Sequence, residues 1–229
     1  MATAYLEFLS VLREHNTKEW MDAHRDDYQA VRKAFLADVG QLLAGAMQFE
    51  PGLAHLQPKD CVFRQNRDIR FSANKNPYKT NLAAYLALGG KKSEGPGYYI
   101  HLEPGASFLA VGVWMPPAPI LKQIRQEIDY NGEELQGILD SPNVRSTFRE
   151  MSGEQLKTSP KGYAADHPHI ALLRYKSFII SRPISDASVQ SGRFVAEALA
   201  AWEVGKPFHD FILRASEESE GGDGLLPIL

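Results

Sequence analysis

The residues best suited to chemistry in this chain are basic side chains that gather in one stretch. Residues 59–92 contain eight lysines and arginines but only two acidic residues, which gives this stretch a net charge of +6. Arg64, Arg67 and Arg70 recur at every third position, and Lys79 follows nine residues after Arg70. The planar guanidinium group binds carboxylate and phosphate groups through paired hydrogen bonds. The pattern therefore predicts a binding site for a phosphate- or carboxylate-bearing small molecule.

The same basic stretch has two other interpretations. The arginines could pair with Asp68 and with backbone carbonyl groups, in which case they only stabilise a turn-rich segment. Phe71, Tyr78 and Tyr85 also alternate with the basic residues, as in surfaces that stack nucleic-acid bases or dock an acidic protein. The formal net charge of −3 for the whole chain argues against nucleic acid as the partner. An anion pocket is therefore the leading hypothesis, and a protein- or nucleic-acid-interaction module is the alternative.

A second group of polar residues is expected on one face of a strand. Tyr99, His101 and Glu103 are spaced by two positions, and alternate residues of a strand share a face. His101 and Asp68 are the candidate catalytic residues if they line the same cavity as the arginines. The competing interpretation is a half-buried strand whose tyrosine and histidine form local hydrogen bonds. Further basic residues could join the anion site from the C-terminal half, namely Lys161, Arg174 and Lys176.

The sequence contains no standard catalytic or cofactor motif. It has no His-Glu-x-x-His or Cys-x-x-Cys motif and no dinucleotide-binding fingerprint, and no glycine loop precedes Lys79. His167 and His169 are the best metal candidates, together with Asp166, but three adjacent ligands separated by a proline are a poor metal site. We therefore expect no bound metal, and the sequence defines no cofactor. Cys61 is expected to be a small buried residue.

Helices are expected to surround the residues described above. Residues 5–12 carry apolar side chains at helical spacing, and a longer helix follows to residue 46, with Asn16 as its cap. Further helices are predicted at 120–128, 131–139, 188–202 and 207–215, and Asn131 is expected to cap the second of these. Residues 216–229 are acidic and rich in glycine, so we expect a disordered tail.

The strands are predicted in the middle of the chain. A short strand is expected at 61–65, and residues 82–88 have features of both strand and helix. Residues 98–103 and 107–114 flank a Pro-Gly turn, and apolar residues on both faces of the second segment predict a central strand. Residues 177–181 complete the set. Together these elements predict a single α+β domain over residues 1–215, with an antiparallel-rich sheet flanked by amphipathic helices.

The composition also bounds the cellular context. No apolar run approaches the roughly 18 residues that span a bilayer, so no membrane partner is expected. The first residues lack a basic region before an apolar stretch, which argues against secretion. A single cysteine cannot form an internal disulfide bond, which fits a reducing cytoplasm. The sequence leaves the reaction and the oligomeric state open.

Several blocks of the sequence resemble a known family. They are residues 64–71 and 74–81, the opening stretch 8–16 with Trp20, the segment 98–105, and the short motifs at 156–157, 160–163 and 166–168. The chain is similar, over about residues 4–215, to the bacterial and fungal conserved hypothetical proteins called domain of unknown function twenty-four sixty-one. The resemblance implies a single cytoplasmic α+β domain and makes the arginine cluster part of a family signature. It implies no established activity, cofactor or catalytic residue.

Overall fold

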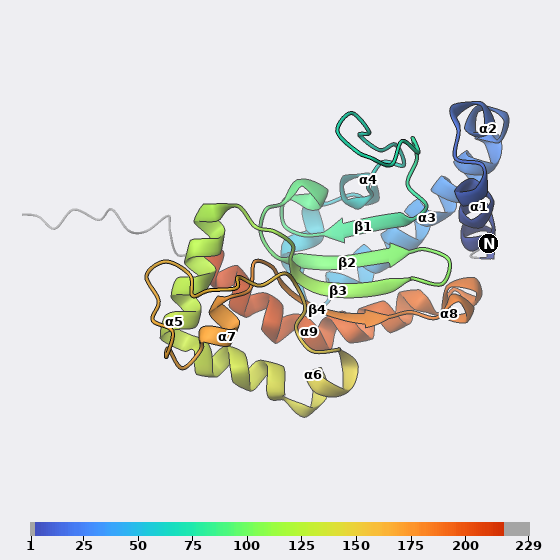
Figure 1. Cartoon of the computed structure of the whole chain (residues 1–229). Coiled ribbons are helices and arrows are strands. Elements are labelled where there is room, and N and C mark those ends of the chain that lie inside the picture. The colour runs from blue at the N-terminus through green and yellow to red at the C-terminus, as the bar shows by residue number, and fades with distance from the viewer. Residues whose placement is uncertain (1–2, 218–229) are drawn as a thin grey trace, which may run out of the picture. The chain divides into compact units, whose positions relative to one another are not determined.

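The N-terminal part of the chain is helical, as its apolar spacing predicts. The computed structural model describes residues 3–217 and begins with α1 (Thr3–Glu14), α2 (Lys18–Ala23) and α3 (Arg25–Ala46) (Figure 1). The Thr17 hydroxyl accepts a hydrogen bond from the Trp20 backbone N–H and caps α2. The prediction that Asn16 is the cap was therefore wrong, because the Asn16 side chain is buried and bonds elsewhere.

The segment before the sheet is less regular than predicted. The 3-10 helix η1 (Pro51–His55) and the short helix α4 (Pro58–Cys61) follow α3. Cys61 ends α4 and is buried, as expected. The strand predicted at 61–65 was wrong, because only Val62 in this segment forms an isolated β-bridge, with Ala84.

The sheet has four antiparallel strands in the order β1-β2-β3-β4. The strands are β1 (Leu82–Leu86), β2 (Gly97–Leu102), β3 (Phe108–Val113) and β4 (Phe178–Pro183), with the 3-10 helix η2 (Gly90–Lys92) between β1 and β2. The register of β1 and β2 places Ala83 opposite His101 and Tyr85 opposite Tyr99. The α+β class and the central position of the β2–β3 hairpin are confirmed.

The turn between β2 and β3 has the geometry that its sequence predicts. The Ala106 backbone N–H donates to the Glu103 carbonyl group at 3.0 Å, and Gly105 has a φ of 75°. A positive φ at the third turn position is the reason for a glycine there. The Ser107 hydroxyl also donates to the Glu103 carbonyl group at 2.9 Å. These bonds fix the position of Glu103 at the end of β2.

The remaining described residues form helices α5 to α9. These are α5 (Ala118–Asp140), α6 (Pro142–Thr147), α7 (Ile170–Leu173), α8 (Asp186–Ser191) and α9 (Phe194–Glu217). The two helices predicted at 120–128 and 131–139 meet at Asn131, whose non-helical φ of −126° kinks α5. The Asn131 amide donates to Glu127 and caps no helix. The break predicted between residues 202 and 207 was wrong, since α9 continues through Pro207.

Contacts divide the chain into two compact units. The first contains the described residues up to Lys92, with Tyr98–Ala110 and Arg182–Glu203. The second contains Ser93–Gly97, Val111–Ser181 and the described residues from Val204 onward. The buried cores include Leu9, Phe35, Ile100 and Trp202 in the first unit, and Ile124, Leu135, Phe178 and Phe208 in the second. The single domain predicted over residues 1–215 stays a prediction.

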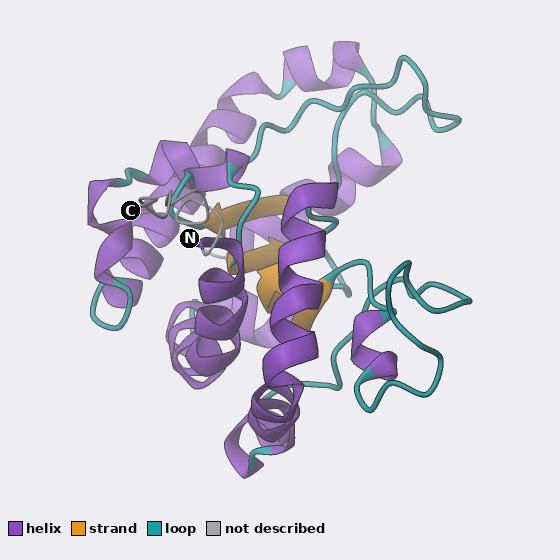
Figure 2. Cartoon of the chain, turned by 90° about the vertical axis from the view of Figure 1, so that its left-hand side faces the viewer, coloured by secondary structure: helices purple, strands orange, loops and turns teal. Residues whose placement is uncertain are grey.

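Long loops connect several of these elements. Figure 2 draws them in teal, and they include most of residues 62–81 and of residues 148–169. In the part of the chain that the structure describes, no helix combines the length and apolarity needed to cross a membrane. The tail predicted from Ser216 lies outside the described residues, except for Ser216 and Glu217, which end α9.

Candidate functional site

Residues 62–81, here called the basic loop, fold back on themselves beside β1. Asn66 and Tyr78 form an antiparallel bridge across the two arms of the loop. The Arg67 backbone N–H donates to the Pro77 carbonyl group at 2.8 Å, and that of Lys79 donates to the Gln65 carbonyl group at 2.9 Å. Backbone pairing therefore brings Lys79, from the second arm, beside the start of the first arm.

Two buried amide side chains hold the base of the basic loop. The Asn16 side chain donates to the Tyr78 carbonyl group and accepts from the Tyr78 backbone N–H, both at 3.0 Å. The Gln65 side chain donates to the carbonyl groups of Lys79 and Asn81. Both amides are less than one tenth exposed. Buried backbone groups need such partners, so Asn16 and Gln65 fix the course of residues 78–81.

Two of the predicted anion-binding arginines bond to groups of the loop itself. Arg70 forms a two-pronged ion pair with Asp68, with N···O distances of 3.0 and 2.7 Å. These hydrogen bonds lower the pKa of the exposed Asp68 carboxyl group. Arg67 donates to the Asn76 carbonyl group at 3.0 Å and to the Ser72 hydroxyl at 3.3 Å. Arg67 and Arg70 thus make the loop-stabilising contacts of the alternative interpretation, and their binding of a ligand stays a prediction.

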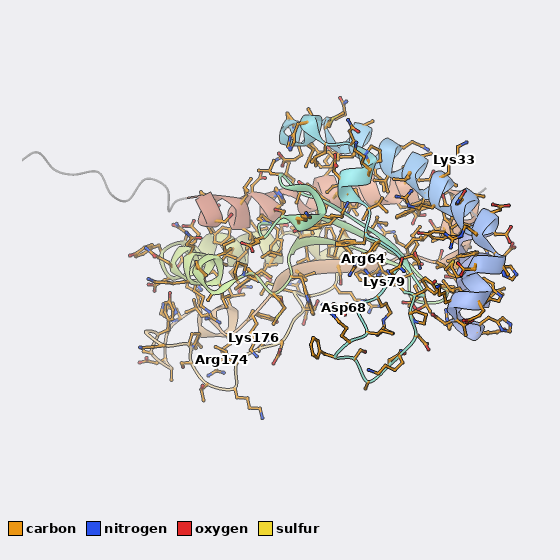
Figure 3. All side chains as sticks on the ribbon, turned by 90° about the horizontal axis from the view of Figure 1, so that it is seen from above. Lys33, Arg64, Asp68, Lys79, Arg174 and Lys176 are labelled. Carbon is orange, nitrogen blue, oxygen red and sulfur yellow. The ribbon has the colours of Figure 1, made fainter. Side chains whose placement is uncertain are left out.

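Arg64 and Lys79 differ from Arg67 and Arg70 of the same loop. Within residues 3–217, neither side chain forms a hydrogen bond or an ion pair with an acidic residue. The two side chains lie close to each other in Figure 3. Burial and the positive charge of Arg64 both lower the pKa of Lys79. The Lys79 ammonium group lies 5.2 Å from the centre of the Phe63 ring. We call Arg64 and Lys79 the cation pair.

Tyr99, His101 and Glu103 are joined by hydrogen bonds along one face of the sheet. The Tyr99 hydroxyl lies 3.0 Å from His101 Nδ1, and His101 Nε2 lies 3.1 Å from a Glu103 carboxylate oxygen. The Thr80 hydroxyl donates to the other Glu103 oxygen at 2.8 Å. The His101 ring stacks on Phe108 with 4.8 Å between ring centres. The sequence correctly placed the three polar residues on one face.

The surroundings of Glu103 and Tyr99, at the two ends of this face, shift the pKa values of both groups. Burial alone would raise the pKa of the Glu103 carboxyl group, but hydrogen bonds from His101 and Thr80 outweigh it and lower the pKa. Burial and the nearby charge of Glu103 raise the pKa of Tyr99 to about 12. At neutral pH the face therefore has a carboxylate at Glu103 and a protonated phenol at Tyr99.

The cation pair and this polar face are neighbours in the first unit. The Phe63 ring lies under the Lys79 ammonium group and also contacts the Tyr99 ring edge to face, with 6.4 Å between ring centres. Lys79 is followed directly by Thr80, which bonds to Glu103, and by Asn81, whose amide lies 3.4 Å from His101 Nδ1. The sequence analysis did not single out Thr80 and Asn81 as site residues. Their position between Lys79 and the start of β1 is the feature that could have indicated them.

Comparison with protein families places these residues in a known context. Residues 4–211 match the family described as conserved hypothetical protein (DUF2461). The chain belongs to this family. No curated protein and no solved structure matches the chain. The DUF2461 match includes the basic loop, the cation pair and the polar face of β2.

Three further basic residues predicted for the anion site of this DUF2461 member belong to the second unit. Lys161 is exposed, and Lys176 forms an ion pair with Glu154 at 2.6 Å. Arg174 is half-buried, and its Nε atom has no hydrogen-bond partner among the described residues. Because the cation pair lies in the first unit, the site is built here from first-unit residues. The contribution of Lys161, Arg174 and Lys176 stays a prediction.

The histidines considered as metal ligands bond within the second unit. His167 Nε2 lies 2.8 Å from an Asp129 carboxylate oxygen. The backbone N–H of His169 donates to His167 Nδ1 at 3.1 Å. Both ring nitrogens of His167 thus have protein partners.

The aromatic residues of the basic stretch differ in exposure. Tyr78 is 9% exposed and Tyr85 is half-buried, whereas Phe71 is 96% exposed at the turn between the two arms of the basic loop. Burial raises the pKa of Tyr85. Only Phe71 of the three offers an open ring for stacking.

A surface hollow also lies along α3. It is lined by Tyr28, Gln29, Arg32, Lys33 and Leu36, of which Lys33 is labelled in Figure 3. All of these residues belong to one helix. No second element supplies converging polar groups, which a specific small-molecule site needs.

Proposed function

We propose that this protein binds an anionic small molecule, with a phosphate or carboxylate group held between Arg64 and Lys79. The observation that supports this is the cation pair itself. Among residues 3–217, neither of these two neighbouring cations forms a hydrogen bond or an ion pair with an acidic residue. The carboxylate whose charge interacts with Arg64 is that of Asp68, which is already paired with Arg70. The mutual repulsion of Arg64 and Lys79 contributes to the lowered pKa of Lys79. A bound anion offsets this repulsion, because it places a negative charge beside both cations.

The chemistry of the two side chains favours an oxygen-rich anion. A guanidinium group can bind two oxygens of one carboxylate or phosphate group, while an ammonium group acts as a compact point charge. Charge-assisted hydrogen bonds of this kind contribute about 1.5–3 kcal/mol each. The adjacent Tyr99–His101–Glu103 face makes an enzyme acting on such an anion a consistent extension of the proposal.

The direct test measures thermal unfolding with inorganic phosphate, acetate and citrate as probes. We expect at least one probe to stabilise the wild-type protein, by about 2.7 kcal/mol at a hundredfold excess over Kd. Arg64→Ala and Lys79→Ala should each weaken binding by about 10- to 100-fold. Lys33→Ala, which removes one exposed positive charge from α3, should respond as the wild type does. A wild-type protein that responds to none of the probes would overturn the proposal.

The alternative, an interaction module, is favoured by one observation. The exposed Phe71 ring lies 5.8 Å from the Arg70 guanidinium carbon, so the loop presents an aromatic ring beside positive charge. Single-stranded nucleic acids bind such surfaces by stacking and by phosphate contacts. Filter binding of single-stranded RNA and DNA at low salt tests this alternative. Retention that is lost in Phe71→Ala would support it, and absence of retention would end it.

We also propose a cytoplasmic location. The single cysteine, Cys61, is buried, and its side chain forms no disulfide bond. Such cysteine use is typical of a reducing compartment.

A further inference from the structure

The hydrogen bonds around His101 define which ring nitrogen carries the proton. A Glu103 carboxylate can only accept hydrogen bonds, so His101 Nε2, at 3.1 Å from it, must donate. A neutral imidazole has a single N–H, which leaves Nδ1 as an acceptor. The Tyr99 hydroxyl at 3.0 Å and the Asn81 amide at 3.4 Å are both able to donate to Nδ1. The contacts are therefore consistent with one tautomer, with the proton on Nε2.

This arrangement has the order of groups found in hydrolase triads, with a phenol in place of the serine hydroxyl. In such triads a hydroxyl donates to an imidazole, and the imidazole donates to a carboxylate that orients it and stabilises its protonated form. Here Tyr99 is the hydroxyl, His101 the imidazole and Glu103 the carboxylate. Thr80 bonds to the second oxygen of Glu103 and thereby orients the carboxylate in turn. The His101 ring also stacks on the Phe108 ring, which helps to hold its orientation.

We propose that Tyr99, His101 and Glu103 form a proton relay for the anion site, in which Tyr99 contacts the bound anion and His101 accepts the proton. The proposal rests on the proposed function, because the cation pair is the group that holds the anion beside Tyr99. Tyr99 would be the catalytic residue, and His101 and Glu103 would be positioning residues that act through it.

The relay allows two proton movements, and the number of protons is conserved in each. When His101 takes up a proton at Nδ1, its new N–H donates to the Tyr99 oxygen, and the Tyr99 O–H turns to donate to the bound anion. When a bound molecule instead gives a proton to the Tyr99 oxygen, the original Tyr99 proton passes to His101 Nδ1. In each case one proton reaches His101 and no other protein group changes its charge. In the second case the bound molecule, which gave up the proton, becomes more negative by one charge. The class of reaction that fits is proton abstraction from an anionic substrate.

Several charged or titratable groups face this relay from the elements packed around it. Lys79 from the basic loop contacts the same Phe63 ring as Tyr99 does, and Tyr85 from β1 lies opposite Tyr99. Arg13 from α1 donates to the Pro104 carbonyl group and lowers the pKa of Glu103. None of these groups lies between Tyr99 and His101, since the two are in direct hydrogen-bond contact. Removal of the Tyr99 hydroxyl therefore breaks the hydrogen bond to His101 and leaves the surrounding charges in place. Its effect on the pH dependence of binding distinguishes the relay from the influence of these charges.

The first experiment is ¹⁵N NMR of the histidine side chains in the free protein at about pH 8, where an unperturbed imidazole is neutral. The His101 signals are assigned by their loss in His101→Gln. We expect a proton on Nε2 and none on Nδ1. The opposite tautomer would overturn the relay, whatever the anion-binding result.

The second experiment measures the affinity of the wild-type protein for sulfate between pH 6 and pH 8. Sulfate keeps its charge over this range, so any proton exchange belongs to the protein. Uptake of one proton with the anion makes the affinity fall by up to about tenfold for each unit of rising pH. Tyr99→Phe and Glu103→Gln should still bind sulfate, because the cation pair is intact, but with a much weaker pH dependence.

The matched control is Tyr85→Phe, which removes a hydroxyl from the same sheet face directly opposite Tyr99. It should retain the wild-type pH dependence. A pH dependence that persists in Tyr99→Phe would show that His101 responds only to the field of the anion, and the relay would be wrong. A wild type that binds neither sulfate nor any of the phosphate, acetate and citrate probes would instead overturn the proposed function, and the relay's role in anion binding with it.

Discussion

At the scale of single residues, Asn16 connects the start of the chain to the basic loop. Its side chain bonds to both backbone groups of Tyr78, which lies next to Lys79. Asn16→Ala leaves a buried N–H and a buried carbonyl group without partners, so we expect a loss of about 2–3 kcal/mol in the free energy of unfolding. We also expect weaker phosphate binding, because Lys79 loses its fixed position.

Urea unfolding and phosphate titration of the same samples test this prediction. Thr17→Ala is the control, because it removes the α2 cap at a cost of about 1 kcal/mol and does not touch the loop. Equal effects of the two substitutions on phosphate affinity would contradict the role of Asn16.

The residue scale also shows what the sequence could and could not predict about the site. The shared face of Tyr99, His101 and Glu103 follows from strand geometry alone, and it was predicted correctly. The role of Asn16 depends on a backbone partner 62 positions away, while its local sequence resembled a helix cap. Arg67 hydrogen-bonds to groups of the loop and Arg64 does not, because the fold of the loop brings the Asn76 carbonyl group near Arg67. The three-residue spacing of the arginines does not predict this difference.

At the scale of secondary-structure elements, β3 approaches a neighbouring strand unusually closely at Gly112. Gly112 has a φ of 126°, and a Cβ atom built there would lie 2.0 Å from the Phe178 carbonyl oxygen. Gly112→Ala therefore forces the backbones apart and adopts a strained conformation, which should cost about 3 kcal/mol or more. Gly137→Ala is the control, because no atom lies near its Cβ position in α5 and alanine favours the helix.

Urea unfolding followed by circular dichroism compares the two variants. We expect Gly112→Ala to unfold at a much lower urea concentration than the wild type, and Gly137→Ala at an equal or slightly higher one. A Gly112→Ala protein as stable as the wild type would show that β3 and β4 are not held this closely.

Elements with a local sequence signal were predicted better than those that depend on distant partners. The β2–β3 hairpin has its signal in four turn residues, and α1 has its signal in apolar spacing. The segment 61–65 has strand-like composition, yet Pro58 starts a short helix that ends at Cys61. The kink at Asn131 was visible as a helix boundary, whereas the continuity of α9 through Pro207 was not, because buried residues on both sides of the proline outweigh its local effect.

At the scale of the whole molecule, carboxyl groups with lowered pKa values make the stability depend on acid pH. Glu103 in the first unit and Asp210 in the second are both of this kind. For Asp210, burial would raise the pKa, but hydrogen bonds from His209 and Lys206 outweigh it. A carboxyl group whose pKa is lower in the folded state stabilises that state above its unfolded pKa, and this stabilisation disappears as the pH falls through the folded value.

We therefore expect Glu103→Gln to be less stable than the wild type at pH 7, and the difference to shrink as the pH falls below the ordinary glutamate value of 4.5. Urea unfolding at pH 7, 5, 4 and 3 measures it, with Glu7→Gln on the exposed face of α1 as the control. A stability difference that stays constant over this range would show that the charge of Glu103 contributes nothing and that only the shape of its side chain matters. Convergence of the two curves at low pH would instead show that Glu103 is a carboxylate in the folded protein, the state in which it can orient His101.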